Sequence, residues 1–401
     1  MNILYICHRL PYPPNKGEKI RAFHQLRYLA TRHTIHLACL VDDAEDLQHV
    51  EALERYCASI DMVYRPKIGA KLLALRALCT NQPLSVASFY SSALASKVRQ
   101  RLAVERVDRI VVFSSAMTVY VQQVSGIPKV IDFVDVDSEK WRLFADYHPW
   151  MLSWVYRLEA RRLARHEVEV ARVFDHTILV TDREAQILQE HVPDRPISVI
   201  PNGVDLEYFT PPPHRGTVTE PPALVFTGMM DYFPNVDAVN YFCHEIFPLV
   251  REVVPAVQFY IVGRNPTQQV RQLSRQPNVI VTGAVSDVRP YLVRARVAVA
   301  PLRIARGVQN KILEAMAMGL PVVGTPAALQ GTWATTTDGV RMAESPRAFA
   351  HALVTLLEDH ALRRQCGLQA RRYVQEHHQW DEHNARLEAL LREMVVAQAT
   401  A

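Results

Sequence analysis

The sequence predicts an α/β protein with two parallel-sheet domains, and three observations lead to this prediction. Short apolar runs, such as residues 1–7 and 297–301, indicate buried strands, and helical patterns follow them. The 401 residues, 49% of them hydrophobic, are enough for two separate cores. Residues 210–222 contain five prolines, so they cannot form a helix or a central strand. This segment marks the domain boundary, and two sheets joined there imply a cleft suited to a small ligand.

Composition excludes several classes of protein. The formal net charge is only +4, whereas a dedicated nucleic-acid-binding protein normally has a basic domain. The six cysteines are scattered without a Cys-x-x-Cys pair, which fits a reduced cytoplasmic compartment and argues against a zinc site. No apolar run is long enough to span a bilayer, and the first residues indicate a strand rather than a signal peptide. We therefore expect a cytoplasmic protein with no nucleic-acid partner.

The first domain is expected to begin with a strand, a loop, a helix and a second strand. Residues 1–7 form the first strand, a proline-rich turn leads to Gly17, and a helix runs from about Glu18 to Thr31. A glycine in a loop at a helix start suits a phosphate or sugar, but a single glycine is a weak signal. The other strands are expected at residues 33–41, 109–114, 129–133 and 175–180.

Acidic residues cluster directly after the strand at residues 129–133. The carboxyl ends of parallel strands are where such sheets carry out catalysis. Asp137 is expected to cap the helix that begins near Ser138. Asp135 is the better candidate for a site, because a carboxylate can either position an acceptor hydroxyl or accept its proton.

Two stretches of the first domain combine basic and apolar side chains. Residues 65–101 contain seven Arg or Lys residues and no acid, and residues 150–165 contain two Trp and four Arg. Such stretches favour contact with anionic lipid headgroups, although an ordinary solvated helical face has the same composition. Peripheral attachment to the inner face of the cytoplasmic membrane is therefore one of two interpretations.

The second domain is expected to carry a ligand site at the carboxyl edge of its sheet. Its first two strands, residues 223–227 and 259–262, run into Gly228 and into Gly263-Arg264. Later strands are expected at residues 279–282, 297–301 and 321–324, with a helix from about Gln309 to Gly319. Open parallel sheets bind ligands at this edge.

The turn at residues 302–310 suits a phosphate-bearing ligand. Gly307 lets the backbone approach a ligand, and the following helix start favours an anion. Glu314, the lone acid nearby, is expected to accept hydrogen bonds from ribose hydroxyls. Alternatively, Lys311 and Glu314 are only a solvated helical pair. The positive charge around the turn comes from Arg303, Arg306 and Lys311.

The same turn and helix resemble the donor site of retaining glycosyltransferases of family 4. Gly307, Gln309, Lys311 and Glu314 match the variant Gly-x-Gln-x-Lys-x-x-Glu-Ala, and the resemblance implies that Glu314 binds the ribose. The commonest form of the motif has another Glu eight positions before the one that matches Glu314. This chain has Arg306 at that position, so the role of the first motif Glu with the donor sugar is not carried over. Many relatives have a basic pair after the glycine that matches Gly228. In this chain the compensation of the phosphate charge is assigned to Arg303, Lys311 and Arg264.

The opening of the chain extends the resemblance. Residues 8–29 are similar to the start of family 4 enzymes, in particular sugar transferases associated with the PEP-CTERM and exosortase exopolysaccharide systems. This implies that Gly17 lies beside the donor phosphates and that the loop, with Arg21, faces the acceptor. A His often occupies the loop that contains Asp135, and this chain lacks it. His377 and His378 precede the family's final helix, and we expect them at the surface rather than at a metal, because neighbouring helical residues point apart.

The resemblance implies the GT-B fold, with two facing Rossmann-like domains at residues 1–205 and 206–376 and a helix at residues 377–401 returning to the first. It implies a retaining transfer of sugar from a nucleotide-diphosphate donor to a glycan or lipid-linked hydroxyl, in exopolysaccharide or cell-surface glycan synthesis. Basic side chains and a helix dipole would replace a metal or other cofactor. Asp135, Lys311 and Arg303 would be catalytic. Two alternatives remain, a nucleotide-sugar epimerase and an inactive glycan-binding scaffold.

Overall fold

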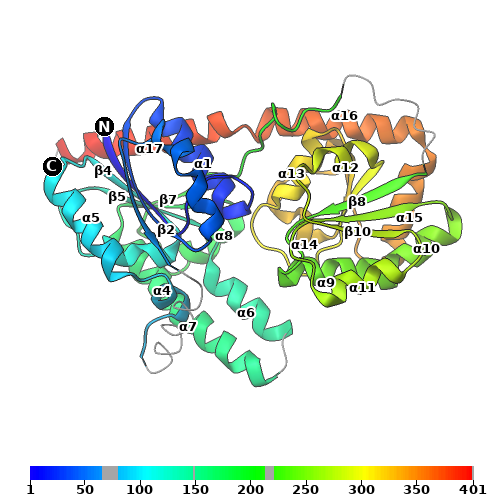
Figure 1. Cartoon of the computed structure of the whole chain (residues 1–401), viewed down its shortest axis with the longest axis horizontal. Coiled ribbons are helices and arrows are strands. Elements are labelled where there is room, and N and C mark those ends of the chain that lie inside the picture. Colours follow the sequence, from blue (N-terminus) through cyan, green and yellow to red (C-terminus); the bar gives the residue numbers. More distant parts are fainter. Residues whose placement is uncertain (66–79, 148–149, 213–220, 400–401) are drawn as a thin grey trace. The chain divides into compact units, whose positions relative to one another are not determined.

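The computed structural model describes residues 1–65, 80–147, 150–212 and 221–399, drawn in Figure 1. These residues divide into two units, each built on its own parallel sheet. Met1–Pro201 and Trp380–Ala401 make the first unit, and Asn202–Gln379 make the second. Of the basic stretch at residues 65–101, residues 66–79 lie outside the described part of the chain.

The sheet of the first unit has seven parallel strands in the order β3-β2-β1-β4-β5-β6-β7. The central strand β1 pairs on one side with β2 and on the other with β4, so its carboxyl end lies between theirs. The strands are β1 (Asn2–Cys7), β2 (Thr34–Val41), β3 (Ser59–Tyr64), β4 (Arg109–Phe113), β5 (Lys129–Val134), β6 (His176–Leu179) and β7 (Ile197–Val199).

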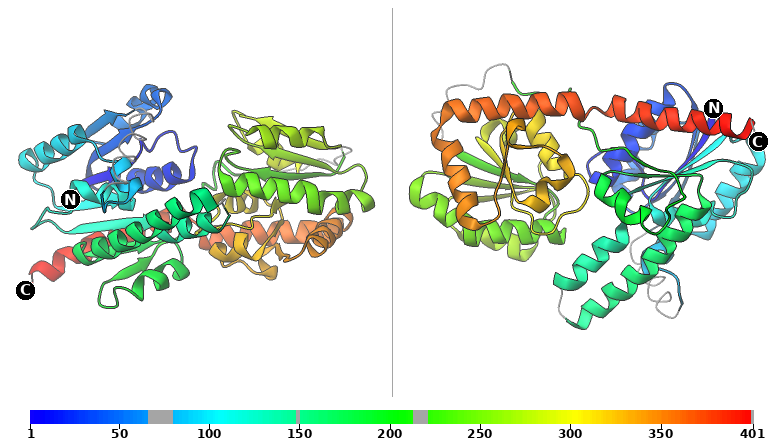
Figure 2. Two further views of the ribbon diagram at one scale, coloured as in Figure 1. Left: turned by 90° about the horizontal axis from the view of Figure 1, so that it is seen from below. Right: turned by 180° about the vertical axis from the view of Figure 1, so that it is seen from behind.

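Helices cover both faces of this sheet, because the side chains of β1 alternate between two buried clusters. Ile3 and Tyr5 join the cluster that contains Leu26 and Leu391, whereas Leu4 and Ile6 join the other one. In Figure 2, α6 and α7 extend side by side from the first unit. The helices are α1 (Gly17–Ala30), η1 (Ala44–His49), α2 (Glu51–Glu54), α4 (Leu84–Ser88), α5 (Ser92–Val104), η2 (Ser115–Tyr120), α6 (Asp137–Tyr147), α7 (Trp150–Val173), α8 (Asp182–Gln189) and α17 (Trp380–Ala399).

The sheet of the second unit has six parallel strands in the order β10-β9-β8-β11-β12-β13. Its strands are β8 (Ala223–Thr227), β9 (Gln258–Val262), β10 (Val279–Gly283), β11 (Val297–Ala300), β12 (Val322–Gly324) and β13 (Val340–Met342). The helices of four or more residues are α9 (Phe233–Tyr241), η3 (Phe242–Ile246), α10 (Phe247–Val253), α11 (Gln268–Gln272), α12 (Arg289–Arg294), α13 (Asn310–Ala317), α14 (Pro326–Leu329), α15 (Pro346–Glu358) and α16 (His360–His377). The strand order reverses between β8 and β11, which places the carboxyl ends of these strands at the usual ligand position of such a sheet.

The predicted α/β fold, with two Rossmann-like sheets and a C-terminal helix, is confirmed. The expected surface position of His378 is wrong, because its side chain is fully buried. His378 Nδ1 lies 2.8 Å from the carbonyl oxygen of Asn202, and its ring packs near Trp333 and Tyr373. The helix α16 ends at His377, so the two histidines do not share a helical surface. No metal-binding group of His, Cys, Asp or Glu occurs among the described residues.

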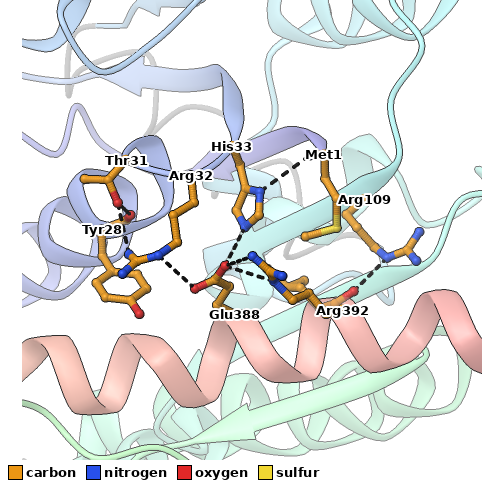
Figure 3. Close-up of polar contacts among 9 residues, drawn as sticks. Met1, Tyr28, Thr31, Arg32, His33, Arg109, Glu388 and Arg392 are labelled. Carbon is orange, nitrogen blue, oxygen red and sulfur yellow. Dashed lines mark hydrogen bonds and ion pairs between the residues drawn. The ribbon is translucent and has the colours of Figure 1, made fainter.

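Helix α17 belongs to the first unit, where polar contacts hold it beside His33, which precedes β2, and Arg109, which begins β4 (Figure 3). The Glu388 carboxylate accepts hydrogen bonds from Arg392 at 2.6 Å and lies 3.1 Å from His33 Nε2. Arg109 Nε donates to the carbonyl oxygen of Leu391 at 3.0 Å. The aromatic rings of His24 and Trp380 stack with their centroids 4.8 Å apart.

We expect Glu388→Gln to lower the free energy of unfolding of the first unit by about 1–2 kcal/mol, because it removes the charge that these donors share. Chemical denaturation gives the measurement. The matched control is Glu376→Gln on α16, where an exposed carboxylate pairs only with the exposed Arg372. An equal effect of the two variants would contradict a special role for Glu388.

Candidate functional site

Two glycines bring the carboxyl ends of β8 and β9 into backbone contact. A Cβ atom added to Gly263 would lie 1.6 Å from the carbonyl oxygen of Gly228, so no larger residue fits there. A Cβ atom on Gly228 would lie 2.7 Å from Asn235 Nδ2 and 3.2 Å from Lys311 Nζ. Because Gly228 has no side chain, the Lys311 amine has room at the end of β8.

Lys311 is held at this edge by two partners from other elements. Its Nζ donates a hydrogen bond to Asn235 Oδ1 at 2.5 Å and lies 4.2 Å from the centroid of the Phe226 ring. Asn235 is buried on α9 and its amide donates to the carbonyl oxygen of Met229 at 2.9 Å, so the oxygen faces Lys311. Sequence analysis missed Asn235, because nothing local distinguishes it from a helix-start residue.

Lys311 and Glu314 are not a solvated ion pair. No ion pair joins them among the described residues, and each side chain is only partly exposed. Burial lowers the pKa of Lys311 to about 7, against the opposing effect of the Glu314 charge. Burial likewise raises the pKa of Glu314 to about 7, although Lys311 opposes this shift. Two groups that lose their charge this easily are typical of a site that a ligand completes.

The other predicted residues of the turn have partners of their own. The Arg303 guanidinium pairs with Asp237 on α9, with Nε 3.0 Å from Oδ2, and lies over the Tyr241 ring. Its charge is thus compensated by an acid 66 residues away that sequence analysis did not consider. Gln309 Nε2 donates to the carbonyl oxygen of Arg306 at 2.8 Å, which closes the turn. The proposed roles of these side chains with a donor stay predictions.

Two further sets of contacts brace the start of helix α13 and the turn before it. Asn202 Nδ2 donates to Asn310 Oδ1 at 3.0 Å, and the Asn202 carbonyl oxygen lies beside the buried His378. Gly307 has a φ of +59°, and a Cβ atom on Gly331 would lie 2.1 Å from the Gly307 carbonyl oxygen. Glycine is therefore required twice to pack this turn against the backbone. Arg264, by contrast, is exposed just after Gly263.

In the first unit, three buried carboxylates hold the loop that contains Asp135. Asp132 Oδ1 accepts a hydrogen bond from the N–H of Val134 at 3.0 Å, and Glu184 accepts one from Val136 at 2.7 Å. Glu167 accepts from the N–H of Ser138 at 3.1 Å and from its hydroxyl at 2.5 Å. The N–H groups of Val134, Val136 and Ser138 are thus each bound to an acidic side chain, and these side chains come from β5, α8 and α7.

This arrangement corrects the predicted role of Asp137. Asp137 is the first residue of α6, and its carboxylate pairs with Lys140 at 3.3 Å. The helix start is instead held by Glu167, which reaches Ser138 from α7. Val134 has a φ of +68°, which is rare for a β-branched residue and is a form of strain found near functional sites. Asp135 therefore lies in a loop whose backbone is fixed on both sides of it.

Arg21 belongs to the network below this loop. Its side chain is 1% exposed, its Nε donates to Asp132 Oδ2 at 2.7 Å, and its Nη1 donates to the carbonyl oxygen of Pro201 at 3.2 Å. Gln25 donates to the same carboxylate oxygen at 2.6 Å. This burial gives Arg21 a structural role, and its proposed contact with an acceptor stays a prediction. Gly17 is the first residue of α1.

Comparison with known proteins agrees with this geometry. Residues 221–359, which contain all six strands of the second sheet, match the family model "Glycosyl transferases group 1". A stretch of 216 residues, 50% of this chain, is 24% identical to the UDP-Gal:alpha-D-GlcNAc-diphosphoundecaprenol alpha-1,3-galactosyltransferase of Escherichia coli. The match spans about half, 52%, of that relative's length.

Solved structures match almost the whole chain. The match to sucrose-phosphate synthase from Thermosynechococcus elongatus has a TM-score of 0.73 and 17% sequence identity. It covers 99% of this chain and 100% of the synthase chain. The match to Alr3699/HepE of Anabaena, solved in complex with UDP, has a TM-score of 0.68 and 15% sequence identity. It covers 98% of this chain and 100% of the Anabaena chain. The fold is therefore GT-B. The family match in the second domain agrees with the predicted enzyme class.

We expect Glu167→Gln to change how stability depends on pH. Burial raises the pKa of Glu167 to about 8 from 4.5, and the nearby Asp137 and Glu184 carboxylates add to this shift against the opposing bonds from Ser138. The stability that protonated Glu167 contributes is thus complete below pH 4.5 and is lost as pH rises through 8. Glutamine keeps the hydrogen bonds without the charge. As pH increases from 5 to 8.5, the free energy of unfolding of the variant should therefore rise by at least about 1 kcal/mol relative to that of the wild type.

Chemical denaturation over that pH range is the measurement. Glu169→Gln, an exposed change on the same helix, is the control and should follow the wild type. Parallel pH profiles for the wild type and Glu167→Gln would show that Glu167 is ionised throughout.

Proposed function

We propose that this protein is a glycosyltransferase that moves a sugar from a nucleotide-diphosphate donor to a hydroxyl of a glycan or lipid-linked acceptor. The observation that supports this most is the pairing of Lys311 with Asn235 beside the bare backbone of Gly228. A cationic side chain in such a position suits a diphosphate. The match of residues 221–359 to a glycosyltransferase family supports the same reaction class.

In this proposal Lys311 changes its protonation when the donor binds. Its pKa of about 7 leaves the amine partly neutral without ligand, and a diphosphate beside it would raise that pKa and make it an ammonium ion. The ammonium ion would then stabilise the leaving diphosphate, whose negative charge grows as the glycosidic bond breaks. Glu314 would accept hydrogen bonds from the ribose, and Asp135 would contact the acceptor in the first domain. Retention of configuration, and the roles of Arg303, Arg264 and Gly17, are part of the same proposal.

The relatives suggest substrates. The Escherichia coli relative is named for a UDP-galactose donor and a GlcNAc-diphosphoundecaprenol acceptor, and the Anabaena structure contains UDP. We therefore propose a UDP-sugar donor and an acceptor linked to a lipid diphosphate. A role in exopolysaccharide or other cell-surface glycan synthesis would follow, and the likeness to PEP-CTERM-associated transferases is consistent with it.

A two-stage experiment tests this function. A thermal-shift panel of UDP-, GDP-, ADP- and TDP-sugars identifies the donor, because a ligand that binds the native state raises its stability. Release of the nucleotide diphosphate is then measured with and without membrane lipid extract. Release that depends on the extract supports the transferase. Conversion of the sugar without acceptor would indicate an epimerase, and binding without either reaction would indicate a scaffold.

We expect Glu314→Gln to raise the donor KM about ten- to a hundredfold, because a charged hydrogen bond to a ligand contributes about 1.5–3 kcal/mol. Initial rates at varied donor concentration give the measurement, and thermal unfolding checks the fold. The exposed Glu358→Gln on α15 is the matched control. An unchanged donor KM in Glu314→Gln would refute the ribose role.

Attachment to an anionic membrane is a separate proposal. Helix α7 exposes Trp154 at 56%, together with Arg157, Arg161 and Arg165. In the other basic stretch Arg101 pairs with Asp61 at 2.9 Å, so that stretch is not free of compensating acids. Among the described residues, no helix has the length and apolar character needed to cross a bilayer. Electrostatic attraction of about 1 kcal/mol per basic residue would give reversible binding without a spanning helix.

Sedimentation with vesicles tests this attachment. We expect the protein to pellet with anionic but not with neutral vesicles, and to be released by salt, since charges are screened over about 8 Å at physiological ionic strength. Changing Trp154 to Ala, and Arg157, Arg161 and Arg165 to Gln, should abolish pelleting. The control changes three exposed arginines of the second unit, Arg271, Arg275 and Arg347, to Gln. Equal pelleting of the α7 variant would refute this surface.

A further inference from the structure

His8 is a polar side chain of the first unit that the proposed reaction has not used. It directly follows β1, so it lies at the carboxyl edge of the sheet, as do Asp135 and Asp137 after β5. Its ring stacks on Phe113, the last residue of β4, with centroids 5.9 Å apart and planes 5° apart. Because β4 lies between β1 and β5, this stacking places the imidazole on the side of β1 that faces the Asp135 loop.

Aromatic packing fixes the ring without using its nitrogens. Phe89 meets the same ring edge-on at 5.4 Å, so two rings define its position. His8 Nδ1 is buried without a hydrogen-bond partner, and no hydrogen bond to Nε2 exists among the described residues. The His8 residue is only half-buried, so its ring is not sealed from a ligand.

The other histidines of this sheet differ from His8. His36 bonds to Ser59 at 2.8 Å, and His176 bonds to Ser198 at 2.8 Å. His166 in α7 contacts Thr118 at 3.1 Å. A partially buried imidazole without such a partner is costly unless something else completes it. The missing partner at His8 therefore needs an explanation beyond packing.

Charged groups surround the ring from several elements. Arg9 pairs with Glu18 of α1 and lies 3.3 Å from Asp42 after β2. The charge of Asp137 in α6 also acts on the His8 ring. Burial lowers the pKa of His8 to about 4, with Arg9 acting in the same direction and Glu18, Asp137 and Asp42 opposing it. The imidazole is thus neutral at physiological pH. Since no partner of Nδ1 fixes the tautomer, Nε2 can either accept or donate a hydrogen bond.

We propose that His8 Nε2 binds the acceptor, by a hydrogen bond to the sugar hydroxyl that receives the transferred group or to its neighbour. A hydroxyl both donates and accepts, which suits a neutral ring whose tautomer is not fixed. This inference rests on the proposed transferase function, and it adds a residue that determines acceptor affinity rather than donor affinity.

Three substitutions separate hydrogen bonding from packing. His8→Phe keeps the stacking on Phe113 and removes both nitrogens. His8→Gln places an amide near the position of Nε2, and His8→Asn places one near the position of Nδ1. We expect acceptor KM to rise about tenfold in His8→Phe and His8→Asn, the loss of roughly one hydrogen bond, and less in His8→Gln. The donor KM should stay at the wild-type value in all three.

The assay uses the full-length protein, UDP-galactose or the donor found by thermal shift, and an alkyl-diphosphate-linked GlcNAc or membrane lipid extract as acceptor. His191→Ala is the control, because His191 lies beyond the end of α8 and, within the described part of the chain, its ring bonds to the Ile187 carbonyl oxygen of the same segment. Thermal unfolding confirms that each variant folds.

The outcomes distinguish the two proposals. If the wild type transfers sugar but His8→Phe keeps its acceptor KM within twofold, or if donor KM rises equally, the role of His8 is wrong and the transferase stands. The same holds if His8→Gln behaves no better than His8→Asn. If the wild type shows no acceptor-dependent turnover with any pair, both proposals fall.

Discussion

Backbone N–H groups at strand ends and helix starts have no partner within their own element, and in the first unit buried carboxylates supply it. Asp132, Glu184 and Glu167 do this for the loop after β5. Glu159 does it for α4, where it accepts hydrogen bonds from the N–H groups of Leu84 and Ser85 at 2.6 and 2.8 Å. Three of these four acids come from helices that cover the sheet. The carboxyl edge is therefore shaped by the layer behind it rather than by the loop sequences alone.

The described loops of the second unit are arranged in another way, by glycines rather than by carboxyl groups. Its loops are brought together by contacts between bare backbones, Gly228 with Gly263 and Gly307 with Gly331. Such contacts leave space that side chains would otherwise fill, and Lys311 extends into it towards Asn235. The chemical difference between the two edges is consistent with their proposed ligands, since a diphosphate needs close backbone and positive charge, whereas a sugar hydroxyl needs individually placed polar groups.

Sequence patterns predicted what depends on neighbouring residues. Most of the strands, the glycine positions and the helix start before Lys311 follow from local periodicity and turn chemistry, and so do the two sheets. Strands β3 and β13 were not expected. Partners that are distant in sequence were not predictable. Asp237, for example, compensates Arg303 across 66 residues, and Glu167 takes over the cap expected from Asp137. His378 was misplaced for the same reason, because its burial depends on Asn202, 176 positions earlier.

The last helix of the chain completes the first core. Leu387, Leu390 and Leu391 of α17 pack in the same buried cluster as Ile3 and Tyr5 of β1. Synthesis on the ribosome proceeds from the N-terminus, and domains generally fold as they emerge. Until α17 has been made, the part of this core that it covers stays open, although α1 already packs on the same face through Leu26 and Leu29. The second unit, which precedes α17 in the chain, can therefore reach its native structure before the first core is complete.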